Sequence, residues 1–218
     1  MTALIRYQFT VLLLSQRYLA PLLLFLGLVA VLTSSDTGPL AATYAAVAGA
    51  MLLCSVWLTT TLVGLEDQSH RSVVVVSAGS HLRVLLGTVG AVAVWCLMLT
   101  AAGLVLPPLF GAHALGLADL TLGAEAQLTC AFAGMAIGLV CSRLVCRRQG
   151  YALVLALVLL LAALVGKGFS PVNIMLTRLQ NVRSPTDALP ATGIQLVAAV
   201  GVLAAGVAVT QTVTARKR

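Results

Sequence analysis

Charged residues are scarce in this sequence of 218 residues. Only 9% of the positions are Asp, Glu, Lys or Arg, whereas 60% are hydrophobic. Soluble domains carry charge at about a quarter of their positions, so this chain cannot build a surface that faces water. The mean hydropathy of +1.05 agrees with that conclusion. The composition therefore predicts an integral membrane protein and leaves little chain for a soluble domain.

Motifs that carry out chemistry are missing as well. The sequence has no HExxH, no GxSxG and no pair of carboxylates inside an apolar run, although an intramembrane enzyme would need such groups. The one Gly-Lys pair, Gly166-Lys167, has Leu161 where a phosphate-binding loop requires glycine. We therefore expect no catalytic residue, no metal site and no ATP hydrolysis by this chain itself.

The cysteines and the spans give no sign of metal binding or ion coupling. The five cysteines show no CxxC pairing and no histidine at metal spacing, so we interpret them as small packing residues. They are Cys54, Cys96, Cys130, Cys141 and Cys146. An ion-coupled carrier usually has an acid at mid-membrane or a span broken by Gly and Pro, and neither is clear here. Energy for any transport should come from elsewhere.

Long apolar runs recur along the chain. A bilayer core about 30 Å thick is crossed by about 20 apolar residues in a helix, and runs without alternation exclude barrel strands. We predict an all-α, polytopic membrane protein that forms a single transmembrane domain over residues 1–218. Its six helices are predicted at 19–34, 40–65, 82–106, 123–142, 151–165 and 191–213.

The distribution of Lys and Arg predicts the orientation, because short basic loops stay in the cytoplasm. Ten of the 13 basic residues fall on one side of the predicted spans: Arg6, Arg17, Arg71, Arg83, Arg143, Arg147, Arg148, Arg216, Lys217 and Arg218. The other side has Lys167, Arg178 and Arg183. Both termini are therefore predicted to be cytoplasmic, with a basic tail at 214–218. The net charge of +7 marks topology, and we expect no nucleic-acid partner.

Residues 1–17 precede the first predicted span. Apolar Ile5, Phe9, Leu12 and Leu13 alternate at helical spacing with polar Arg6, Gln8, Thr10 and Arg17. This pattern predicts an N-terminal helix that lies along the inner membrane surface. The alternative is that these residues lengthen the first span.

Small residues and hydroxyls mark the interior of several spans. Gly134 and Gly138 form a GxxxG pair, which favours close helix packing in membranes. Ser55, Thr59 and Thr60 place hydroxyls along the second span and are candidates for lining a substrate path, although helical hydroxyls usually bond to their own backbone.

The connection between the second and third spans is the most informative segment. It reads GLEDQSHRSVVVVSAGSHLRVLLG over 64–87: an acidic pair, a short amphipathic stretch, a turn of small residues and Arg83. In this order the chain resembles the membrane subunits of type-two ABC exporters, in which an acidic cluster, a coupling helix, a turn and a basic residue follow the second span. Family members often have Gly after the acidic cluster and Pro in the turn, where this chain has Gln68-Ser69 and Ala78-Gly79.

The resemblance implies a function. A separate ATP-binding cassette subunit, which carries ATP and Mg, would dock on the coupling segment, whose expected contacts are Glu66, Asp67, Gln68, Ser69, His70, Arg71 and Arg83. A second permease copy or a homologous permease would complete the membrane dimer. The substrate would be amphipathic or hydrophobic (a lipid, a peptide or a drug-like molecule), exported across a bacterial cell membrane.

The long segment at 166–190 carries a further expectation. Ser170-Pro171 predicts a helix start, and Val172, Met175, Leu179 and Val182 predict one apolar face. In the resembled family this region forms short helices that dip into the outer leaflet and cap the exit path, so Met175 and Arg178 are added to the candidate path.

Other interpretations stay open at this point. The acidic pair could be a solvated loop that marks topology only, and the basic loop at 143–149 could bind anionic lipid. The chain could be a non-transporting membrane scaffold or an immunity protein. An intramembrane enzyme is the third alternative.

Overall fold

The described part of the chain is helical throughout its regular structure. The computed structural model describes residues 2–34, 40–65, 80–110, 116–142, 149–166, 168, 170–180 and 185–216. The helices in these residues are α1 (Thr2–Ser15), α2 (Leu19–Ser34), α3 (Leu40–Leu65), α5 (His81–Phe110), α6 (Leu117–Val140), α7 (Gln149–Val165), α8 (Pro171–Gln180) and α9 (Pro185–Arg216). The prediction of an all-α protein is confirmed.

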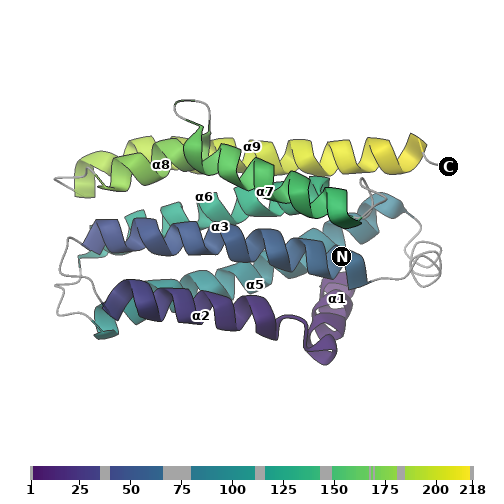
Figure 1. The fold of residues 1–218 in the computed structure, drawn as a ribbon, viewed down its shortest axis with the longest axis horizontal. Coiled ribbons are helices and arrows are strands. Elements are labelled where there is room, and N and C mark those ends of the chain that lie inside the picture. The colour runs from purple at the N-terminus through teal and green to yellow at the C-terminus, as the bar shows by residue number, and fades with distance from the viewer. Residues whose placement is uncertain are drawn as a thin grey trace.

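Helices α3 and α6 form the centre of the bundle. In each, 67% of the most apolar 18-residue window is buried, compared with 39% in α5 and 17% in α9. Figure 1 shows α2 and α5 on one side of this central pair and α7, α8 and α9 on the other. The core is correspondingly divided into one apolar cluster among α2, α3 and α5 and a second among α3, α6 and α8.

Among the described residues, four helices are long and apolar enough to cross a membrane: Leu40–Gly64, Leu82–Leu109, Leu117–Val140 and Leu189–Thr214. The pair Arg6–Ser15 and Leu19–Ser34 supplies a fifth if it is counted as one bent span. Helix α7 is apolar, but its 17 residues extend only about 26 Å, which is less than the bilayer core. The chain is thus a multi-pass membrane protein with four to five spans by length and composition.

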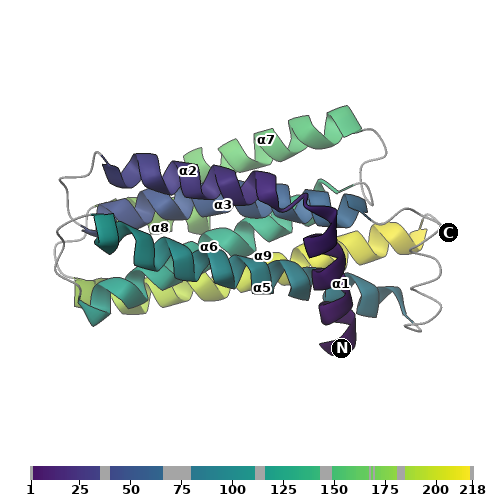
Figure 2. The ribbon, with the colours of Figure 1, turned by 90° about the horizontal axis from the view of Figure 1, so that it is seen from below.

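Helix α1 crosses one end of the bundle. It is bent by 80° from α2, and Gln16 at the bend has φ 54. Figure 2 shows α1 running nearly at right angles to the other helices. Phe9 and Tyr18 pack on Trp95 of α5, with ring centroids 5.8 Å and 4.9 Å apart. The expected helix is confirmed, but Gln8, which we assigned to its polar face, is buried because α1 packs on α5.

Helix α8 follows α7 after a short break. The break contains Gly168, whose φ of +78 suits glycine, and α8 begins at Pro171 as predicted. Val172, Met175 and Leu179 are buried against α3 and α6, which confirms the predicted apolar face; Val182 lies outside the described residues. In Figure 1, α7 and α8 together extend along most of the bundle.

Candidate functional site

Of the seven predicted coupling residues, the structure describes Arg83. Glu66, Asp67, Gln68, Ser69, His70 and Arg71 lie outside the described residues. Arg83 is exposed in the first turn of α5. That turn lies at the end of the bundle that α1 crosses, where α3 and α9 also end (Figure 2).

Two hydroxyls of the candidate path lie in the interface between α3 and α6. Ser55 and Thr59 are buried, and they donate hydrogen bonds to the carbonyl oxygens of Leu52 and Ser55, at 2.9 Å and 2.7 Å. Their side chains contact Gly134 and Gly138 of α6. A Cβ atom at position 134 would lie 2.7 Å from the Leu52 carbonyl oxygen, so only glycine allows this approach. The predicted GxxxG contact is confirmed, and within one protomer these hydroxyls face a helix.

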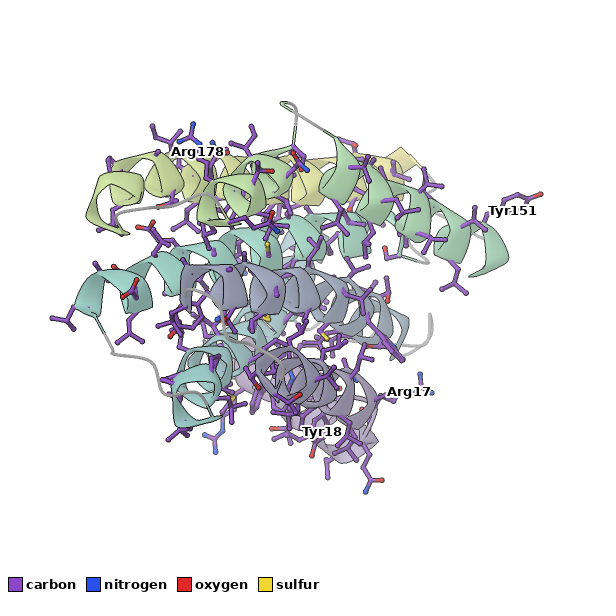
Figure 3. All side chains as sticks on the ribbon, turned by 60° about the vertical axis from the view of Figure 1, so that its left-hand side comes forward. Arg17, Tyr18, Tyr151 and Arg178 are labelled. Carbon is purple, nitrogen blue, oxygen red and sulfur yellow. The ribbon has the colours of Figure 1, made fainter. Side chains whose placement is uncertain are left out.

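The other path candidates are dispersed. Thr60 donates to the carbonyl of Trp57 on its own helix. Met175 is on the inner face of α8 and is fully buried in the core. Arg178 is exposed on α8 and points outward in Figure 3. The structure therefore brings Ser55 and Thr59 together and separates them from Arg178.

A groove of about 560 Å³ lies between α3 and α7. Its lining residues are Arg17, Leu53, Val56, Trp57, Thr60, Thr61, Gly64, Cys141, Ser142, Ala152, Leu153, Ala156, Leu157 and Leu160. Helix α7 makes few contacts with α3 and α6, and Figure 2 shows it standing away from the rest of the bundle. Of the five candidates for the substrate path, only Thr60 lines this groove. The sequence gave no signal for the groove, because its walls are formed by two helices about a hundred residues apart.

One carboxylate lies deep in a span. Glu125 is the ninth residue of α6, about 12 Å along the helix axis, and it is partly buried. The Thr192 hydroxyl of α9 donates a hydrogen bond to Glu125 Oε2, and Thr192 Oγ1 also lies 2.9 Å from the carbonyl oxygen of Leu189 on its own helix. We predicted that the fourth span would start at 123, which would leave Glu125 near the surface. The helix instead begins at Leu117, so Glu125 lies two turns inside α6, where its carboxylate links α6 to α9.

A second buried polar group sits nearby on α6. Gln127 is fully buried, and neither its amide oxygen nor its amide nitrogen has a hydrogen-bond partner among the described residues. Its amide contacts Gly103 of α5, where a Cβ atom would lie 2.6 Å from Gln127 Oε1. Thr100, one turn earlier on α5, also has an unpaired buried hydroxyl. Burial of an unpaired amide costs about 1–3 kcal/mol. The Gln127 side chain therefore lowers the stability of the packing around α6.

The remaining reactive groups serve packing. Cys54, Cys96, Cys130 and Cys141 are buried, as predicted for small packing residues. Cys146 lies outside the described residues. Within those residues, no group of three or more His, Cys, Asp or Glu side chains could hold a metal ion. The groove between α3 and α7 is the part of this arrangement that could hold an apolar ligand. No family model, curated protein or solved structure matches this sequence.

Proposed function

We propose that this chain is the permease subunit of an ATP-driven exporter of amphipathic or hydrophobic molecules. The observation that carries the proposal is the set of elements gathered at one end of the bundle. There α1 lies across the end, α3 finishes at Leu65, and α5 begins at His81 with Arg83 in its first turn. The 64–87 connection, with its acidic pair, joins α3 to α5 at this end.

Six crossings are part of this proposal. Helix α2 is the first, and α7 with α8 together form the fifth, since α8 extends the path of α7 by ten residues. The Asn173 side-chain amide donates to the Leu164 carbonyl across the break, which ties the two helices together. A span broken in this way exposes backbone groups that need such partners inside a membrane.

A cytoplasmic location for the end that α1 crosses follows from the charges. Arg6, Arg17 and Arg83 lie at this end, and Asp119 lies in the first turn of α6, at the opposite end. Basic residues favour the cytoplasmic side. Both termini would then be cytoplasmic, since α1 lies at this end and α9 finishes there.

The packing suggests how force could pass into the membrane. A partner ATPase, which holds ATP and Mg, would dock on the 64–87 connection and push on the end of α3. Because α3 and α6 contact each other through glycines, with no space for independent movement, they would move as one rigid unit. A second permease copy would face this unit across the membrane.

Capture of the partner tests the proposal. The tagged chain is purified from its native membrane in mild detergent, and the bound proteins are identified by mass spectrometry. We expect an ATP-binding cassette subunit, and we expect Glu66→Arg with Asp67→Arg to reduce its recovery at least tenfold. Recovery of the chain without such a subunit would overturn the proposal and favour a membrane scaffold.

A further inference from the structure

The groove between α3 and α7 has the depth of one membrane leaflet. Its α3 wall runs from Gly64 to Leu53, eleven residues or about 16 Å along the axis. The hydrocarbon core of a bilayer is about 30 Å thick, so the groove ends near the middle of the membrane. Its volume of about 560 Å³ falls in the range of about 300–1,000 Å³ of small-ligand sites.

The walls of the groove suit hydrocarbon. Leu53, Val56, Leu157 and Leu160 line its deeper part, and Ala152 and Ala156 of α7 widen it. The hydroxyls of Thr60, Thr61 and Ser142 all donate to carbonyl oxygens of their own helices. No hydroxyl proton of the lining is therefore left to bind a sugar or another polar ligand.

The mouth of the groove suits an anion. Arg17 lies there and points away from the helices on the side where α7 begins, as Figure 3 shows. The two acidic side chains that the structure describes, Asp119 and Glu125, are in the first half of α6. Cys141, at the mouth of the groove, is 16 residues beyond Glu125, about 24 Å along the axis. Neither carboxylate can neutralise Arg17.

We propose that the groove binds one acyl chain of an anionic phospholipid, with the lipid phosphate on Arg17. A guanidinium pairs strongly with phosphate oxygens, and Trp57 in the groove wall is partly exposed, so it can contact a bound acyl chain. A free phosphate ion would leave the apolar walls empty, and a zwitterionic lipid such as phosphatidylcholine offers Arg17 a phosphate whose charge its own ammonium group offsets. The acyl chain would fill the groove that separates α7 from α3. This inference does not depend on the exporter proposal.

Quenching of Trp57 fluorescence tests the proposal. The full chain carrying Trp95→Phe, in which Trp57 is the remaining tryptophan, is reconstituted in phosphatidylcholine vesicles. Phosphatidylglycerol or phosphatidylcholine with brominated acyl chains is then titrated in. Bromine quenches a tryptophan that it contacts, so we expect an apparent affinity for brominated phosphatidylglycerol at least threefold above that for brominated phosphatidylcholine.

Three variants in that background complete the test. Arg17→Ala should bring the affinity ratio to about one. Arg6→Ala removes an exposed cation from the same end without touching the groove, and should leave the ratio unchanged. Ala156→Phe fills the groove and should reduce quenching by both lipids. Equal quenching by the two lipids in the parent, or an unchanged ratio in Arg17→Ala, would overturn the proposal.

Discussion

Helices α6 and α7 are placed against α3 in opposite ways. Helix α6 is in close contact with α3, whereas α7 is separated from it. Gly134 and Gly138 bring α6 against the backbone of α3. Helix α7 presents large aliphatic side chains, of which Leu153 is 69% exposed and Leu157 is 60% exposed, and a groove separates it from α3. Lipid tails are as apolar as leucine, so large apolar side chains do not draw helices together in a membrane, whereas small residues allow close contact.

The same contrast bears on the proposed function. The helix that leads into the proposed coupling connection, α3, is the one packed most tightly on α6. In the proposed lipid complex, an acyl chain would lie between α7 and α3, so that α7 contacts α3 mainly through the lipid.

Gly134→Leu should have the largest effect. A side chain at this position meets Ser55 and the Leu52 carbonyl, and α3 and α6 must separate, at a cost above about 3 kcal/mol. We expect loss of folded monomer in size-exclusion chromatography after heating. Gly201→Leu is the matched control, because Gly201 is exposed and no atom lies within 4 Å of the added Cβ. Equal thermal stability of the two variants would contradict the tight contact.

Shortening a leucine should distinguish the two regions directly. Leu52 of α3 is fully buried, and Leu161 of α7 is 50% exposed and outside the groove lining. Leu52→Ala should lower the free energy of unfolding by about 2–5 kcal/mol. Leu161→Ala should cost less than about 0.5 kcal/mol, because lipid can replace its contacts. Similar losses in a thermal unfolding assay in detergent would show that α7 is as firmly packed as α3.

Thr192→Val should weaken the contact between α6 and α9. The variant keeps the shape of the side chain but removes the hydroxyl that donates to Glu125, so we expect a loss of about 1–2 kcal/mol in unfolding free energy. Thr121→Val serves as the control, because the exposed Thr121 hydroxyl bonds only to its own helix. If both variants unfold at the same temperature, the Glu125 contact does not contribute to stability.

Gln127→Met should have the smallest effect and the opposite sign. Methionine has a similar length and no hydrogen-bonding need, so it removes the unpaired amide from the interior. We expect the unfolding free energy to rise by about 1 kcal/mol. A fall in the unfolding free energy would mean that the Gln127 amide makes hydrogen bonds in the membrane and does not destabilise α6.

Periodicity and composition were sufficient to predict much of the fold. The span at 40–65 coincides with α3, and the start of α8 at Pro171 follows from the preference of proline for the first helical turn. The predicted end of the third span was wrong at two prolines. We ended this span at 106, but α5 continues through Pro107 and Pro108 to Phe110. Each of these prolines removes one backbone hydrogen bond from the last turns of α5, and the Leu104 carbonyl, which Pro108 leaves without its helical donor, accepts a hydrogen bond from the Tyr44 hydroxyl at 3.2 Å.

The tertiary contacts could not be predicted in this way. The predicted start of α6, at residue 123, was six residues late, which left Asp119 outside the helix. An acid in the first turn instead suits the helix dipole. The pairing of Glu125 with Thr192 joins positions 67 residues apart, and the α3–α7 groove depends on how far α7 stands from the bundle. Neither feature leaves a local pattern in the sequence.

ATP turnover by the complex purified through this chain tests the central claim, that the chain is the membrane subunit of an ATP-driven exporter. We expect the purified complex to hydrolyse Mg-ATP, and we expect Glu66→Arg with Asp67→Arg to lower the turnover at least tenfold while the permease itself keeps its thermal stability. A stable complex without ATPase activity, or turnover that is unchanged when the acidic pair is reversed, would contradict the claim.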